Sequence, residues 1–226
     1  MSGLASFNPS TFGSRSQGTL AQGSDGSLYG TTFYGKTGGG NGTVFRVTTN
    51  GVLTKLAELY DPQYPDGPLV FGPDGALYGT SFQGRGGTVY RVTTNGSVSV
   101  LKFFDRFNGP TTGSSPSGGV ILDENFQAYG VTSYGPYGNT TADQNFAGTV
   151  FKLDLSSKLE ALGKLPNGFV LSFSGMPYVQ YQLLRATKIT GPWANLAVVR
   201  PDASGNGVYT NTSPPATNAF YRMRIR

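Results

Sequence analysis

Three aspartates, Asp25, Asp74 and Asp123, recur at predicted turns and are the residues whose placement could carry chemistry. They could act as paired carboxylates or as calcium ligands. A calcium loop needs several oxygen ligands at close spacing, whereas an aspartate in a tight turn accepts hydrogen bonds from nearby backbone N–H groups and needs no other role. We therefore predict that these three carboxylates stabilise turns.

Asp61, Asp66 and Asp105 are further acidic residues that could bind a metal. They also lack the several closely spaced oxygen ligands that a calcium loop needs, so we do not expect a metal site there. Histidine and cysteine are both absent from the 226 residues. This absence excludes disulfides, zinc fingers and catalysis by histidine or cysteine. We therefore predict no enzymatic activity, no metal and no cofactor.

Aromatic side chains in three predicted loops could contact a ligand. These residues are Phe33, Tyr34, Phe82, Tyr134 and Tyr137. Aromatic rings can stack on sugars because they present an apolar face. They could equally fill a core or form contacts between subunits, so a polysaccharide partner is one alternative at this stage.

The elements that must position these residues are predicted to be strands. The sequence contains 34 Gly and 14 Pro, the two residues that most disfavour helices. Hydrophobic residues make up 37% of the chain, enough for a core. No apolar run approaches the roughly 20 residues that a membrane helix requires, so we predict no membrane span.

Two sequence motifs each occur three times. The first, Asp-Gly-x-Leu-Tyr-Gly-Thr, occupies residues 25–33 and 74–82 and, in a looser form, 125–133. The second begins Gly-Thr-Val and occupies residues 42–48, 87–93 and 148–154. Each copy is predicted to form four short strands joined by turns.

The repeated blocks are residues 18–60, 67–104 and 118–162. Four strands in roughly 40 to 50 residues are typical of a propeller blade. The loops between the two motifs differ in length among the copies, and such insertions often form the binding face of a repeat protein. These loops carry the aromatic residues named above.

These motifs resemble the GloVer tandem repeat, and the resemblance covers roughly residues 1–162. It is weaker in the third copy, where Ala128 replaces leucine and Val131 replaces threonine. The resemblance implies a bacterial protein outside the cytoplasm, usually followed by a surface-anchoring segment, and it supplies no catalytic residues. We therefore expect an extracellular or cell-surface location, although the sequence shows neither an export signal nor a recognisable anchor.

The first residues of the chain match the fourth-strand positions at residues 56–59 and 101–104. They are Leu4, Ala5, Ser6 and Phe7. The match predicts an orphan strand, which could pair with an exposed sheet edge of a neighbouring copy. Propellers close with four to eight blades, so three blades cannot complete a ring. We therefore expect a homo-oligomer or polymer rather than a monomer.

The repeat pattern stops before residue 165, and strand-like segments follow. They resemble the small β-sandwich domains that end many bacterial surface proteins. Arg222, Arg224 and Arg226 alternate and are predicted to lie on one solvated strand face, without a nucleic acid partner. The predicted domains are an N-terminal segment (1–17), a repeat array (18–164) and a sandwich (165–226).

The predicted fold is all-β, with three four-stranded propeller-blade-like repeats and a small C-terminal β-sandwich. Two functions remain in competition. The first is a non-catalytic extracellular or cell-surface structural protein that assembles head-to-tail into a filament or ring. The second is a carbohydrate- or surface-binding module that acts through the variable loops.

Overall fold

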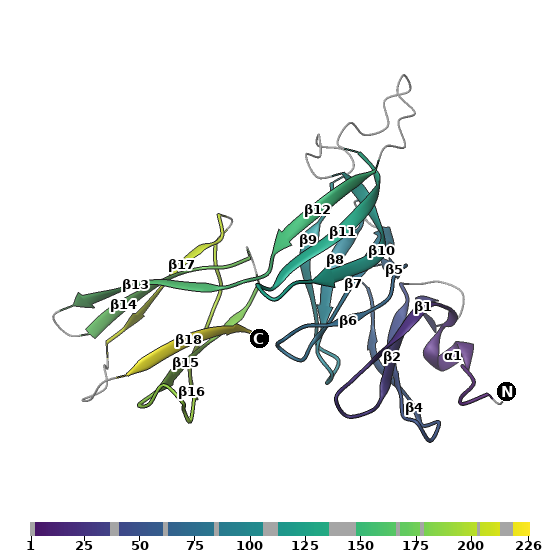
Figure 1. Cartoon of the computed structure of the whole chain (residues 1–226), viewed down its shortest axis with the longest axis horizontal. Helices are drawn as coiled ribbons and strands as arrows, with labels where there is room; N and C mark the ends of the chain where they lie inside the picture. The colour runs from purple at the N-terminus through teal and green to yellow at the C-terminus, as the bar shows by residue number, and fades with distance from the viewer. Residues whose placement is uncertain are drawn as a thin grey trace. The chain divides into compact units, whose positions relative to one another are not determined.

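The structure is a computed structural model, and it confirms the prediction of an all-β chain (Figure 1). It describes residues 3–36, 41–60, 63–83, 86–105, 113–135, 148–165, 168–176, 179–202, 204–212 and 219–226. The chain divides into two compact units, Met1–Leu153 and Asp154–Arg226. No helix among the described residues is long and apolar enough to cross a membrane.

The first unit contains three antiparallel sheets, one for each repeat (Figure 1). Repeat one has β1 (Ser14–Gln22), β2 (Leu28–Tyr34), β3 (Thr43–Val47) and β4 (Leu53–Glu58), paired in that order. Repeat two has β5 (Gln63–Pro65), β6 (Val70–Phe71), β7 (Leu77–Gln83), β8 (Thr88–Val92) and β9 (Val98–Phe103). Repeat three has β10 (Ser114–Leu122), β11 (Gln127–Tyr134) and β12 (Thr149–Asp154).

The first strand of each repeat begins earlier than the sequence predicted. β1 starts at Ser14, so repeat one begins before residue 18, and the register of β1 against β2 shifts between Gln17 and Ala21. The residues before the shift are polar, so a search for apolar runs does not find this part of the strand. In repeat two the corresponding strand is divided into β5 and β6, which both pair with β7.

Repeat three differs from the prediction of a fourth strand. The segment that would supply it is β13 (Lys158–Leu165), which pairs with β14 (Gly168–Ser174) instead. The register of this pair ends at Leu165↔Gly168, so the two strands form a local hairpin, which costs little closure entropy. The two compact units meet between Leu153 and Asp154, whereas the sequence analysis placed the boundary between residues 164 and 165.

A hydrophobic core joins repeats one and two. Repeat one contributes Tyr29, Val44, Ala57 and Leu59, and repeat two contributes Leu69, Leu77, Tyr90 and Val92. At the next junction, the rings of Phe104 and Phe151 meet edge to face with centroids 4.9 Å apart. The apolar side chains of one sheet are thus covered by the sheet that follows.

A short helix, α1 (Pro9–Phe12), precedes β1. The side chain of Asn8 caps it by accepting a hydrogen bond of 2.9 Å from the Ser10 backbone N–H.

The second unit contains two three-stranded sheets. One has β13, β14 and β17 (Asn206–Asn211), and the other has β15 (Tyr181–Ala186), β16 (Ala194–Val199) and β18 (Phe220–Ile225). Phe169 and Leu171 of the first sheet share a core cluster with Leu183 of the second.

Two of the three alternating arginines, Arg222 and Arg224, lie in β18, and Arg226 follows its last residue and donates to Gln180 Oε1 at 3.3 Å. The guanidinium of Arg222 lies 4.3 Å from the ring centroid of Trp193. Two nitrogens of Arg224 donate to Gln182 Oε1 at 2.9 and 2.7 Å. These side chains are therefore occupied by neighbours within their own unit.

Candidate functional site

The two repeat motifs meet at a pair of hydroxyl groups in the sheets of repeats one and two. Thr32 and Thr43 place their Oγ1 atoms 2.8 Å apart, and Ser81 Oγ lies 2.8 Å from Thr88 Oγ1. Both pairs are buried, so a hydrogen bond satisfies groups that would otherwise be costly to bury. The Gly-Thr-Thr and Gly-Thr-Val segments thus recur because they pair across neighbouring strands.

The aspartates stabilise turns as predicted, and each also has a tyrosine partner. Asp25 accepts hydrogen bonds from the Ser27 backbone N–H at 3.0 Å and the Tyr29 hydroxyl at 3.2 Å. The Arg46 guanidinium lies 2.9 Å from its carboxylate. The hydrogen bond from Ser27 is the main cause that lowers the pKa of Asp25.

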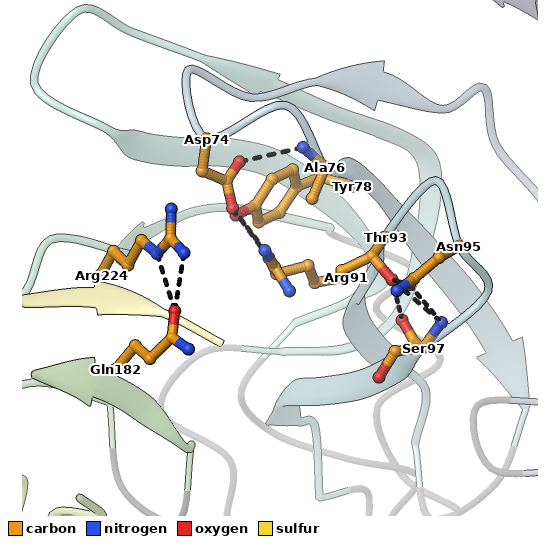
Figure 2. A network of polar contacts seen from close by, with 9 residues as sticks. All are labelled: Asp74, Ala76, Tyr78, Arg91, Thr93, Asn95, Ser97, Gln182 and Arg224. Carbon is orange, nitrogen blue, oxygen red and sulfur yellow. Dashed lines mark hydrogen bonds and ion pairs between the residues drawn. The ribbon is translucent and has the colours of Figure 1, made fainter. Parts of the chain in front are cut away.

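The same constellation recurs in repeat two, where it is buried. Figure 2 shows Asp74 accepting from the Ala76 backbone and pairing with Arg91. The Tyr78 hydroxyl donates to Asp74 at 2.9 Å. The Arg91 and Asp74 side chains are only 5% and 16% exposed, against 38% and 43% for Arg46 and Asp25. Burial raises the pKa of Tyr78 well above its usual range.

In repeat three the aspartate lies earlier in the turn: Asp123 is 6 residues before its tyrosine partner, whereas Asp25 and Asp74 are 4 residues before theirs. Asp123 accepts from the backbone N–H groups of Asn125 and Gln127 at 3.0 and 2.8 Å and from the Tyr129 hydroxyl at 3.2 Å. Lys152 replaces arginine, and its Nζ lies 6.0 Å from the centroid of the Tyr129 ring.

Sequence reasoning predicted the turn role of the aspartates and missed their partners. The missed partners are Tyr29, Tyr78, Tyr129, Arg46 and Arg91. The signal was present, because a tyrosine and a basic residue recur in the same two motifs as the aspartates.

The remaining acidic residues do not form a cluster in the described part of the chain. Asp66 is partly buried, which raises the pKa of its carboxyl, while Arg15 acts in the opposite direction. Asp61 lies outside the described residues. The described residues contain no group of three or more His, Cys, Asp or Glu that could hold a metal ion.

Two of the predicted loop aromatics belong to one cluster. Phe33 and Tyr34 have ring centroids 5.0 Å apart, and the ring of Tyr64 from repeat two lies 5.0 Å from Phe33 and 6.1 Å from Tyr34. The guanidinium of Arg15 lies 5.0 Å from the Phe33 centroid, a cation–π contact. Tyr64 and Arg15 were missed because neither occurs in a repeated motif.

The other loop aromatics lie in different sheets. Phe82 is in β7 of repeat two and Tyr134 ends β11 of repeat three. Both are half-buried. Tyr137 lies outside the described residues.

Residues 4–7 lie against repeat one and are not in a strand. Phe7 meets Phe45 edge to face with centroids 4.8 Å apart. A Cβ added to Gly51 would lie 2.5 Å from the Leu4 carbonyl oxygen, and one added to Gly96 would lie 2.2 Å from that of Leu56. Residues 4–7 therefore lie against repeat one in the same way that β4 lies against repeat two.

One sheet face of repeat three is open. Val44, Val89 and Val150 occupy the same place in the second motif, yet they are 0%, 0% and 75% exposed. Ile121 and Val131 share one face of β10 and β11, and they are 70% and 46% exposed. Val150 belongs to the same face, because the residues at the positions of Val131 and Val150 in repeat one, Thr31 and Val44, are directly paired. We call Ile121, Val131 and Val150 the open face, because the corresponding surface of repeats one and two is covered by the next sheet.

Two solved structures resemble part of the chain. A protein assigned to the gluconolactonases is 18% identical over 70% of this chain and 54% of its own length, with a TM-score of 0.35. A luciferin-regenerating enzyme is 13% identical over 70% of this chain and 53% of its own length, with a TM-score of 0.38. The chain thus spans about half the length of these proteins, and likenesses this distant carry no argument about its activity.

A comparison with curated proteins gives no match. A known family of repeats does match most of the chain, including all three motif pairs. Its match covers residues 1–173, so the chain belongs to the Gloeobacter/Verrucomicrobia repeat family.

Proposed function

We propose that this chain is a non-catalytic structural protein that assembles head-to-tail. In this assembly the open face of repeat three packs on repeat one of a second copy. The observation that carries the proposal is the exposure of Val150, because its counterparts Val44 and Val89 are both fully buried. The contact would therefore continue an interface that the chain already forms twice within itself.

A free strand edge supports the same partner. Among the described residues, the sheet of repeat three has three strands and ends at β12, whereas the sheet of repeat one has four. Residues 4–7 occupy the fourth-strand position in front of repeat one. In the proposed assembly they pair with β12 of the neighbouring copy and complete its sheet, which is recognition by strand addition.

The energies indicate that both contacts are needed. Burying a valine or isoleucine contributes about 2 kcal/mol, so the three residues of the open face contribute on the order of 6 kcal/mol. Association costs roughly 4 to 15 kcal/mol in lost freedom of motion. The apolar face alone therefore gives weak binding, and the strand pairing must supply the rest.

The test measures the size of the full chain at increasing concentration by sedimentation and electron microscopy. We expect a filament or ring for the natural sequence, and a monomer for both Val150→Asp and Ser6→Pro. The control is Val208→Asp, at a 66% exposed valine of the second unit, which should assemble normally. A natural chain that stays monomeric at high micromolar concentration contradicts the proposal.

Mixing the two defective variants identifies the contact. Val150→Asp retains the natural residues 4–7, and Ser6→Pro retains the natural open face. A one-to-one mixture should give a dimer and nothing larger, since each pair has only one functional contact. Assembly that continues beyond a dimer, or no association in the mixture, would show that the open face has another occupant.

We also propose an extracellular or cell-surface location for this assembly, supported by the resemblance of the repeats. Cell fractionation and protease treatment of intact cells test it. Protein found only in the cytoplasmic fraction would contradict the location without affecting the assembly.

A carbohydrate-binding role for the variable loops is the second candidate. It is favoured by the cluster of Phe33, Tyr34 and Tyr64 with Arg15 above Phe33, because aromatic rings stack on sugars. A glycan array tests it, with Phe33→Ala expected to abolish binding. Phe103→Ala is the control, at a 48% exposed phenylalanine of β9.

A further inference from the structure

A hollow of about 330 Å³ lies between repeats one and two, and we infer that it binds a neutral polyhydroxylated ligand of about one sugar ring. Its lining includes Ser24, Asp25, Tyr29 and Arg46 of repeat one and Phe71 and Thr94 of repeat two. The volume is at the lower end of the range for small-molecule sites. This inference goes beyond the proposed assembly and does not depend on it.

The hollow is separate from the aromatic loop cluster. β2 runs from Leu28 to Tyr34, so Tyr29 lies at its beginning and Phe33 and Tyr34 lie at its end. The hollow is therefore formed by the turns at one end of the sheets, and the variable loops leave from the other end. A ligand in the hollow would not need the loop aromatics.

Charge balance in the lining favours a neutral ligand. Asp25 and Arg46 form an ion pair with atoms 2.9 Å apart, and both side chains remain about two-fifths exposed. A carboxylate accepts hydrogen bonds and a guanidinium donates them. Neighbouring hydroxyl groups of a sugar can donate to Asp25 and accept from Arg46 without disturbing this balance, whereas an ionic ligand would repel one of the two charges.

The apolar part of the lining suits the face of a sugar ring. Tyr29 and Phe71 meet edge to face with centroids 5.3 Å apart, so each ring holds the other in place. Aromatic faces of this kind pack against C–H groups. The hydroxyls of Ser24 and Thr94 supply further hydrogen-bonding groups at the rim.

At the junction of repeats two and three, an aromatic side chain fills the position that corresponds to the hollow. Gly75 and Phe126 hold the same turn position, since their N–H groups bond to the carbonyls of Gly72 and Asp123 at 3.0 and 3.1 Å. The Phe126 ring packs on Tyr78 with centroids 5.5 Å apart. Gly75 lines the hollow, and a Cβ added there would meet no atom within 4 Å.

Both turn residues have positive φ, +75° at Gly75 and +60° at Phe126. Phenylalanine is therefore tolerated at this type of turn. The substitution Gly75→Phe should fill the hollow and keep the fold, which makes it a direct test of the site.

The experiment measures binding to the full chain by NMR titration, in the Val150→Asp background so that assembly cannot contribute. The probes are methyl α-glucoside, methyl α-galactoside and N-acetylglucosamine, with glucuronic acid and glucosamine as charged analogues. We expect saturable binding of at least one neutral probe, and binding of its charged analogue at least tenfold weaker.

Variants locate the site and separate it from the loops. Gly75→Phe and Arg46→Gln should each weaken binding at least tenfold, while Phe33→Ala leaves it unchanged. Glu58→Gln is the matched control, since it removes the partner of Lys55 from another ion pair of repeat one, at 3.3 Å. The inference is overturned if no neutral probe binds, if charged probes bind more tightly, or if Gly75→Phe binds as well as its parent.

Discussion

Repeats two and three carry the same motifs and differ in what covers them. Val89 and Val150 follow the same Gly-Thr pair, and one is fully buried while the other is 75% exposed. Asp74 pairs with the buried Arg91, whereas the lysine at the corresponding position of repeat three, Lys152, is exposed. The motif therefore determines the strand and its pairing, and the neighbouring sheet determines whether its side chains form a core.

The largest expected effect comes from placing a charge at the shared valine position. Val89→Asp should lower the free energy of unfolding by about 4 kcal/mol, because it buries a carboxylate without a partner. Val150→Asp should change it by less than about 0.5 kcal/mol, as is usual for exposed sites. Urea unfolding of both variants at a concentration where the chain is monomeric provides the comparison, and equal losses would mean that the open face is covered.

Removal of the turn carboxylate should also distinguish the two repeats. Asp74→Ala removes the carboxylate that pairs with the buried Arg91, and we expect a loss of about 3 kcal/mol. Asp123→Ala removes only hydrogen bonds near the surface, at a cost of about 1 kcal/mol. Thermal unfolding measures both, and a larger loss for Asp123→Ala would contradict the difference in burial.

Alkaline pH should destabilise repeat two in particular. Burial raises the pKa of both Tyr78 and Tyr90 above the ordinary value near 10. A raised pKa stabilises the fold below pH 10, and this contribution is lost as pH rises, because the unfolded chain ionises first. For two tyrosines the loss is about 2 kcal/mol between pH 10 and 11. Unfolding followed against pH checks it, and Tyr90→Phe should halve the slope.

The smallest effect is a gain in stability. The Tyr90 hydroxyl is buried and has no hydrogen-bond partner among the described residues. Repeats one and three have Phe45 and Phe151 at this position. Tyr90→Phe should therefore stabilise the chain by about 1 kcal/mol at neutral pH. The reverse change, Phe45→Tyr, should destabilise the chain. Calorimetry measures both variants, and a loss of stability on Tyr90→Phe would mean that the Tyr90 hydroxyl has a hydrogen-bond partner.

Part of the candidate sites could be predicted from local patterns. The aspartate turns follow from residues close in sequence, whereas Phe33 and Tyr34, which were predicted to lie in a loop, form the end of strand β2. The contributions of Tyr64 and Arg15 to the aromatic cluster could not be predicted, since both lie outside the repeated motifs. Likewise, Gly75 and Phe126 look unrelated in sequence until the turn hydrogen bonds align them.

The sequence by itself determined the strands, the turns and the order of three repeats, because backbone pairing and turn chemistry depend on neighbouring residues. Only the tertiary structure decided which copy of each motif is buried, since burial depends on a sheet formed by residues far away in the chain. It also decided the partner of β13, which pairs with β14 across two intervening residues, although only three residues separate it from β12. Three nearly identical motifs therefore produce two covered sheets and one open face.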